Sequence, residues 1–139
     1  MQPLFCYGTL MYRPLLEFLT AQNLLSQEAC LAGYRCLGVK REDYPAIEAC
    51  EGGLVKGLLV RSIPPAAWQR LDRYEGEMYR RTSVQVQLAC GDSEDAWTYV
   101  IRPRYNARLA RREWKYCSRA EAYAKTQLEA MTGAVGEKR

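Results

Sequence analysis

The sequence predicts an α+β domain. Short apolar or alternating segments typical of strands arrive in runs, and helical patterns interrupt them at residues 12–22, 64–75 and 112–131. The resulting order, β-α-β-β-β-α-β-β-α, lacks the regular strand–helix alternation of a parallel α/β fold. This order favours a mixed sheet, for which a closed barrel with the helices outside is a candidate form.

The first half of the chain contributes four expected strands and one helix. Residues 12–22 repeat apolar side chains at helical spacing, and Pro14 suits the first turn of that helix. A glycine, Gly33, interrupts the second extended segment and suggests a bend. The strands are expected at residues 3–7, 28–40, 43–50 and 52–60.

The second half contributes two helices and a hairpin. Two prolines open the helix over 64–75, and Gly76 follows it as a stop signal. Residues 79–90 alternate apolar and polar side chains, as a half-buried strand does. We expect this strand to pair with residues 95–102 across a Gly-containing turn. An amphipathic pattern predicts the last helix over 112–131.

Length and composition indicate one domain. The chain has 139 residues, with 48% hydrophobic and 26% charged side chains, as ordinary globular proteins have. We expect a single domain over residues 1–131 and a frayed tail over 132–139. No apolar run is long enough to span a bilayer, and the N-terminus does not read as a signal peptide, so the expected location is the cytoplasm.

Cysteine and histidine usage narrows the possible chemistry. The sequence has six cysteines without a CxxC pair, which we interpret as reduced packing residues, and it has no histidine. The absence of histidine excludes Cys-His zinc sites and the usual catalytic triads, and no metal site is expected. Acid–base chemistry must therefore use Asp, Glu, Lys, Tyr or Cys.

The positive charge is concentrated near the C-terminus. Residues 1–100 carry 10 basic and 12 acidic side chains, whereas residues 101–139 carry 10 basic and 4 acidic ones. A basic region of this kind forms either a solvated helix face or a nucleic-acid surface. We favour the solvated face, so no nucleic-acid partner is expected.

One glutamate occupies an unusual position on the helix over 64–75. At 100° per residue, Glu75 lies about 20° from Trp68, inside the apolar stripe of that helix. Burial there and the negative end of the helix dipole would both raise its pKa toward the range of a general base. Two interpretations remain open: Glu75 is functional, or it has a structural role, in which it pairs with an arginine such as Arg80 or Arg81 or emerges as the last helical turn frays.

The N-terminal segment "FCYGTL" ends a strand at a glycine. The backbone N–H groups of Gly8, Thr9 and Leu10 could form an anion-binding nest, or this segment is a plain capped turn. With Glu75 it suggests a site that has a carboxylate base and a backbone cradle. The glycines at Gly52-Gly53 and Gly57 match neither a dinucleotide fingerprint nor a P-loop.

Several motifs together resemble a known family. They are "YGTL" (7–10), "LAGYR" (31–35), "YPAI" (44–47), "GGLVKG" (52–57), "LDRYEGEMYRR" (71–81) and "AWTYV" (96–100). In order and spacing they are similar to those of the gamma-glutamylcyclotransferase-like proteins, which include gamma-glutamylamine cyclotransferases and plant AIG2-like proteins. The resemblance covers roughly residues 4–102.

The resemblance implies a small mixed β-barrel flanked by helices, without a cofactor. It implies an enzyme that converts a gamma-glutamyl amide to 5-oxoproline and releases the amine, with a small-molecule substrate as its partner. The "YGTL" loop, residues Tyr7 to Leu10, would bind the gamma-glutamyl moiety, and Glu75 would be the general acid/base. Candidates for lining the pocket are Tyr7, Tyr44, Tyr79 and Tyr99.

One strand departs from the family pattern. Relatives usually have Gly-Glu-x-Tyr where this chain has Gly57-Leu58-Leu59-Val60, so an acid and a tyrosine are missing. This departure favours the alternative of a barrel that binds a small acidic ligand without turnover. The amine half of the substrate stays open: an amino acid, a lysine-like amine or part of a specialised metabolite.

Overall fold

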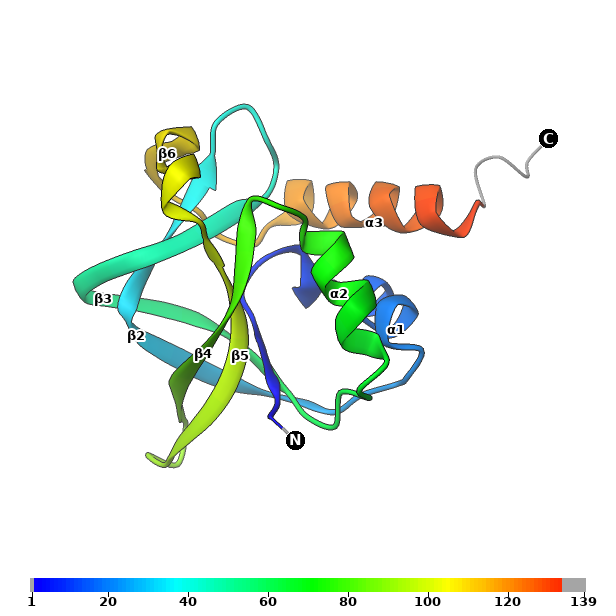
Figure 1. The fold of residues 1–139 in the computed structure, drawn as a ribbon, viewed down its shortest axis with the longest axis horizontal. Coiled ribbons are helices and arrows are strands. Elements are labelled where there is room, and N and C mark those ends of the chain that lie inside the picture. The colour runs from blue at the N-terminus through cyan, green and yellow to red at the C-terminus, as the bar shows by residue number, and fades with distance from the viewer. Residues whose placement is uncertain (1, 134–139) are drawn as a thin grey trace.

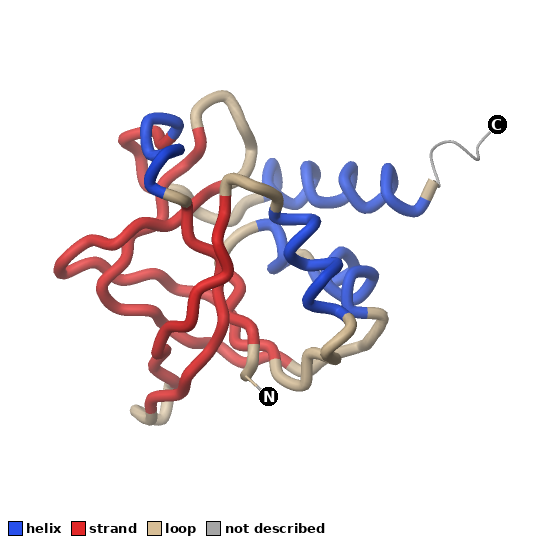
Figure 2. The backbone as a smooth tube through the Cα atoms, viewed as in Figure 1, coloured by secondary structure: helices blue, strands red, loops and turns tan. Residues whose placement is uncertain are grey.

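The protein is a strand-rich structure with its three α-helices on one side (Figures 1 and 2). The structure, a computed structural model, describes residues 2–133. The strands are β1 (Leu4–Cys6), β2 (Ser26–Val39), β3 (Pro45–Val60), β4 (Tyr79–Leu88), β5 (Ser93–Ile101) and β6 (Leu109–Glu113). The helices are α1 (Arg13–Thr20), α2 (Ala67–Glu75) and α3 (Ser118–Thr132), with the 3₁₀ helices η1 (Thr9–Met11) and η2 (Pro103–Arg108).

The sheet closes on itself and confirms the α+β class. Its strand order is β3-β1-β5-β4-β2-β6, and an additional pairing between β3 and β2 closes the first five strands into a barrel. The short strand β1 runs antiparallel to β3 but parallel to β5, which makes the barrel mixed. The predicted small mixed barrel flanked by helices is therefore correct, and β6 adds an extra strand beside β2.

The long pairing of β2 with β3 corrects one prediction. The segments expected as separate strands, 43–50 and 52–60, form the single strand β3. Its register with β2 shifts near Gly33, which has a positive φ of 85°, so the predicted bend lies inside a continuous hairpin. A Cβ on Gly53 would lie 2.3 Å from the Tyr34 carbonyl oxygen, so the two backbones can approach here only at a glycine.

The sequence signals for the second hairpin and for α2 are confirmed. Strands β4 and β5 pair antiparallel from Tyr79 opposite Ile101 onward. Helix α2 begins after two prolines, and the Pro64 carbonyl accepts the Ala67 N–H. Gly76 ends the helix with a φ of 82° and donates its N–H to the Asp72 carbonyl, 3.0 Å away.

The predicted helix over 112–131 is wrong in its first part. Residues 109–113 form β6 instead, and α3 begins only at Ser118. Trp114 donates its backbone N–H to the Cys36 carbonyl at the end of this pairing. Trp114 and Cys117 are spaced as on an apolar helix face, which is why the sequence predicts a helix here. The backbone instead forms hydrogen bonds with the free edge of β2, a distant segment that the local sequence pattern does not identify.

The C-terminal end of α3 overlaps the predicted tail. Thr132 is the last residue of α3 and Gly133 is its C-cap, while residues 134–139 lie outside the described part of the chain. Within the described residues, no helix is long and apolar enough to cross a membrane.

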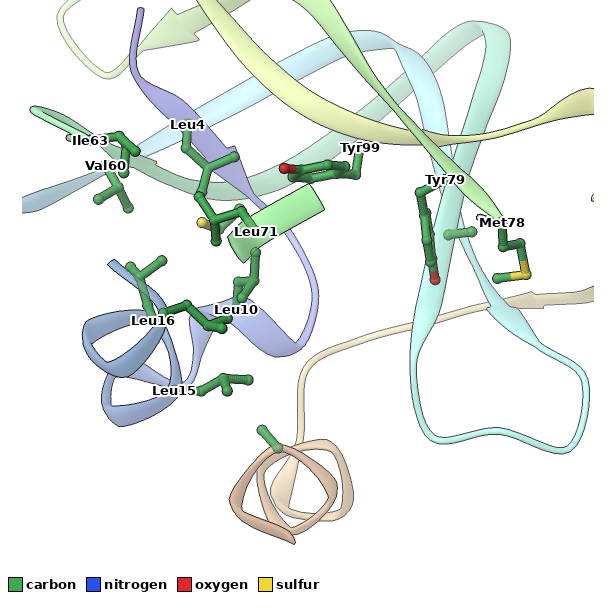
Figure 3. Close-up of a cluster of buried hydrophobic side chains, with 14 of the residues drawn as sticks. Leu4, Leu10, Leu15, Leu16, Val60, Ile63, Leu71, Met78, Tyr79 and Tyr99 are labelled. Carbon is green, nitrogen blue, oxygen red and sulfur yellow. The ribbon is translucent and has the colours of Figure 1, made fainter. Parts of the chain in front are cut away.

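Two apolar clusters hold the barrel and the helices together. One fills the barrel and includes Phe5, Ile47 and Val86. The other lies between the barrel and the helices; Figure 3 shows Tyr79 and Tyr99 on its barrel side and Leu15 and Leu16 on α1. Several residues of this second cluster, among them Tyr79 and Tyr99, also line the cavity described below.

Candidate functional site

A cavity of about 400 Å³ lies where β1, η1, α2 and α3 meet. A cleft of this size is ordinary for a small-molecule site. The structure brings all eight residues predicted for the site to its walls. They are Tyr7, Gly8, Thr9, Leu10, Tyr44, Glu75, Tyr79 and Tyr99. The fold thus places the Gly8–Leu10 segment and Glu75, which are far apart in the sequence, around one cavity. The role of each residue stays a prediction.

The "YGTL" segment lines the cavity because β1 stops before it. After Cys6 the chain turns at Gly8 into η1, and no side chain caps the start of this helix. The first N–H groups of a 3₁₀ helix have no acceptor within the helix, so those of Thr9 and Leu10 are suited to serve another acceptor. A Cβ on Gly8 would lie 3.0 Å from the Pro45 side chain, which is why this tight wall uses a glycine.

A hydrogen bond joins this segment to the helix that carries Glu75. The hydroxyl groups of Thr9 and Tyr74 lie 2.8 Å apart and share a hydrogen bond. Tyr74 lines the cavity and immediately precedes Glu75. Tyr74 is not among the residues predicted for the site, although its position next to Glu75 in the sequence is a signal that could have identified it.

Glu75 is the last residue of α2 and faces the cavity. The side chain is half-buried, so its carboxyl is partly desolvated, and the nearby Asp72 carboxylate acts in the same direction. Together they raise the pKa of Glu75 to about 8. Within the described residues, no salt bridge or hydrogen bond engages the Glu75 carboxyl. The side chain is therefore suited to exchange a proton near neutral pH.

The alternative in which an arginine pairs with Glu75 is wrong, because among the described residues neither Arg80 nor Arg81 forms a salt bridge with it, and Arg81 pairs with Asp72 instead. Its Nε lies 3.1 Å from Asp72 Oδ1. The guanidinium carbon of Arg81 lies 4.6 Å from the Trp68 ring centroid and 5.0 Å from that of Trp97. These two rings and Asp72 hold Arg81 in place.

Besides its ion pair with Arg81, Asp72 accepts a hydrogen bond from Tyr99, a residue of the cavity wall. The Tyr99 hydroxyl donates a hydrogen bond of 2.7 Å to Asp72 Oδ1. Burial and this acceptor raise the pKa of Tyr99 well above its ordinary value, so Tyr99 stays a neutral donor. Asp72 therefore orients Tyr99 and adds negative charge near Glu75.

Replacing this neighbouring carboxylate should change the titration of Glu75. In Asp72→Asn, we expect the pKa of Glu75 to fall below that in the wild type, because a charge that disfavours the carboxylate is gone. A carboxyl ¹³C NMR titration measures the shift. Asp95→Asn, at an exposed position on β5, is the matched control. An unchanged or raised Glu75 midpoint in Asp72→Asn would contradict the assignment.

Two further tyrosines form fixed walls. The Tyr79 hydroxyl donates to the Pro45 carbonyl at 2.5 Å, and the Tyr7 hydroxyl donates to the Tyr99 carbonyl at 2.7 Å. Burial raises the pKa of Tyr7 and Tyr79 far above the ordinary tyrosine value. Both phenols are therefore neutral at physiological pH and are suited to shape the cavity.

We expect Tyr79→Phe to lower the free energy of unfolding by about 1–2 kcal/mol, because the buried Pro45 carbonyl loses its donor. Urea denaturation measures this loss. Tyr105→Phe is the matched control: its hydroxyl donates at the surface to Glu77, which keeps Arg104 as a partner. Equal, small losses in both variants would show that the Tyr79 hydrogen bond does not support the wall.

The outer part of the cavity uses residues that the sequence did not single out. Tyr105 and Arg108 come from η2, and Tyr123 and Gln127 come from α3. The Tyr123 ring lies 5.5 Å from the predicted Tyr44 ring, centroid to centroid. No local motif marks these residues, because they reach the cavity only through the packing of η2 and α3.

The segment that departs from the family pattern does not line the cavity, although Leu58 and Leu59 pair with Cys6 and Phe5 of β1, which do. Leu58, Leu59 and Val60 are absent from its walls. Leu59 and Val60 belong instead to the two apolar clusters. Within the described residues, no group of three His, Cys, Asp or Glu side chains is arranged to hold a metal ion.

Comparisons with known proteins agree with the predicted resemblance. The model of the family described as "Gamma-glutamyl cyclotransferase, AIG2-like" matches residues 4–116. No curated protein sequence is similar enough to this chain to count as a match.

Solved structures share the fold at low sequence identity. An Arabidopsis thaliana protein studied in solution has 22% identity and a TM-score of 0.69, covering 96% of this chain and 81% of its own. An AIG2-like protein from Mus musculus has 21% identity and a TM-score of 0.62, covering 83% of this chain and 88% of its own. A structure titled gamma-glutamyl cyclotransferase has 17% identity and a TM-score of 0.63, covering 75% of this chain and 73% of its own.

Proposed function

Since the chain belongs to the gamma-glutamyl cyclotransferase, AIG2-like family, we propose that it is a cyclotransferase. The reaction converts a gamma-glutamyl amide to 5-oxoproline and releases a free amine or amino acid. One observation carries the proposal: Glu75, with a pKa raised to about 8, and the Gly8–Leu10 segment line the same cavity.

Glu75 acts as the base and then as the acid. The α-ammonium group of the substrate cannot attack until it loses a proton, and the free α-carboxylate beside it makes this amine more basic than a peptide N-terminus, whose pKa is about 8. Because the pKa of Glu75 is raised to about 8, transfer of this proton to its carboxylate costs far less than transfer to an ordinary glutamate. The freed amine attacks the γ-carbonyl carbon, and protonated Glu75 then donates its proton to the leaving nitrogen as the C–N bond breaks. The new ring nitrogen loses its second proton to the Glu75 carboxylate, which passes it to the released amine.

The cavity contributes by holding a bent substrate. Attack within one molecule closes a five-membered ring, so the main requirement is the correct conformer. The tyrosine walls are fixed by their hydrogen bonds to Pro45 and Tyr99 and are suited to this task. Backbone N–H groups around Gly8 to Leu10 serve either the substrate α-carboxylate or the oxyanion that develops on the γ-carbonyl.

A direct assay tests the reaction. The protein is incubated with gamma-glutamyl amino acids and gamma-glutamyl amines, and 5-oxoproline is measured by mass spectrometry together with the released amine. The proposal expects both products in equal amounts from at least one substrate. Absence of 5-oxoproline from the whole panel would contradict it.

The alternative is a barrel that binds a small acidic ligand without turnover. The missing acid and tyrosine at Leu58 to Val60 favour it, although these residues lie outside the cavity walls. Calorimetric binding of gamma-glutamyl amides with no 5-oxoproline formed would select this alternative. For either function we propose a cytoplasmic setting, which suits the six free cysteines.

A further inference from the structure

The rim of the cavity carries one acidic and one basic side chain, Glu77 and Arg108, and both are exposed. Glu77 already has a counter-charge, because Arg104 lies 2.6 Å from its carboxylate. The Tyr105 hydroxyl donates to the same carboxylate oxygen at 3.1 Å. The acidic side chain of the rim is thus neutralised by its own neighbours.

Arg108 has no such counter-charge. Among the described residues it forms no salt bridge. Its guanidinium carbon lies 4.9 Å from the centroid of the Tyr105 ring, and its backbone carbonyl accepts the Lys40 N–H at 2.8 Å. The side chain is therefore positioned by stacking and by a fixed backbone, while its charge stays available to a ligand.

The exposed position of Arg108 suits contact with the amine half of the substrate, the part that the reaction releases. The inner cavity walls are buried residues such as Tyr7 and Tyr79, whereas Arg108 lies where the cavity meets solvent. The gamma-glutamyl group must lie inside, against Glu75 and Gly8–Leu10, for its α-amine to reach the base. The released amine then points outward, toward Arg108.

We propose that Arg108 selects substrates whose released amine carries a carboxylate, so that gamma-glutamyl α-amino acids are preferred over gamma-glutamyl derivatives of uncharged or cationic amines. This proposal rests on the proposed function and deepens it. A guanidinium binds a carboxylate through charge-assisted hydrogen bonds that an uncharged amine cannot make. Gln127 and Tyr123 of α3, which lies beyond the matched residues 4–116, complete this rim.

A matched pair of substrates isolates the carboxylate. Gamma-glutamyl-L-alanine and gamma-glutamylethylamide differ only by this group, because ethylamine is alanine without its carboxyl. We expect the wild type to prefer the alanine compound by about 10-fold in kcat/KM at low salt, and less at high salt. In Arg108→Gln this preference should fall toward one. Arg111→Gln, an exposed β6 variant outside the cavity, should retain it.

Charge reversal gives an independent result. In Arg108→Glu, we expect gamma-glutamyl-(2-aminoethyl)amide, whose released part is cationic, to become a better substrate than gamma-glutamyl-L-alanine. An unchanged order of substrates in Arg108→Glu, or equal wild-type kcat/KM for the alanine and ethylamide compounds, would overturn the proposal.

Binding separates this proposal from the proposed reaction. Affinities of the same two compounds are measured by calorimetry in Glu75→Gln, with and without Arg108→Gln. A preference for the alanine compound that Arg108→Gln removes supports the role of Arg108 even if the wild type forms no 5-oxoproline. Equal affinities, or no binding of either compound, overturn it.

Discussion

Glu75→Gln should lower kcat for 5-oxoproline formation by at least about 100-fold, the lower end of what general acid–base catalysis contributes. The amide keeps the shape of the side chain but can neither accept the proton from the α-ammonium group nor return it to the leaving nitrogen. Steady-state kinetics with the best gamma-glutamyl substrate measures the change, and calorimetry measures affinity separately. We expect the affinity to change far less than kcat.

The matched control is Glu51→Gln. Glu51 is an exposed glutamate of β3 outside the cavity, so this variant makes the same chemical change at an unrelated position. It should keep wild-type kcat. If Glu75→Gln also kept wild-type kcat, Glu75 could not be the proton-transfer group.

The raised pKa of Glu75 also predicts how stability depends on pH. In the unfolded chain this carboxyl titrates near 4.5, whereas in the folded protein it titrates at about 8. Between these values the unfolded state has released a proton that the folded state retains, so the free energy of unfolding falls as pH rises. Above about pH 8 the carboxyl is ionised in both states, and the decrease stops.

Glu75→Gln should remove this decrease. We expect its free energy of unfolding, relative to the wild type, to rise by about 4 kcal/mol between pH 4.5 and pH 9. Urea denaturation at a series of pH values measures the difference, in which the titrations common to both proteins cancel. Glu51→Gln should show no such trend. A constant difference between Glu75→Gln and the wild type would mean that burial does not raise the pKa of Glu75.

The sequence was sufficient for the parts of the site that depend on local signals. Helix α2 has clear start and stop signals, so its apolar stripe could be drawn and Glu75 identified as a carboxylate on the wrong face. The end of β1 at Cys6 was likewise visible as an apolar run that stops before Gly8. Each of these two signals also had a purely structural explanation. Only the three-dimensional structure shows that Glu75 and the segment around Gly8 line the same cavity.

The sequence was insufficient where partners come from distant segments. Strand β6 forms because β2 has an open side, and this pairing removed the first residues of the predicted last helix. Arg108 and Tyr123 reach the cavity through the packing of η2 and α3, for which no spacing rule exists. The Asp72–Arg81 pair, which leaves Glu75 without an arginine, also depends on where β4 begins relative to α2.

The most direct test of the central claim is a crystal structure of Glu75→Gln with unreacted gamma-glutamyl-L-alanine bound. The account predicts the gamma-glutamyl group in the cavity, with its α-amine within hydrogen-bonding distance, about 2.6–3.2 Å, of the residue 75 side chain. It also predicts that the backbone of Gly8, Thr9 and Leu10 contacts the same group. A ligand bound elsewhere, or one whose α-amine points away from residue 75, would contradict the account.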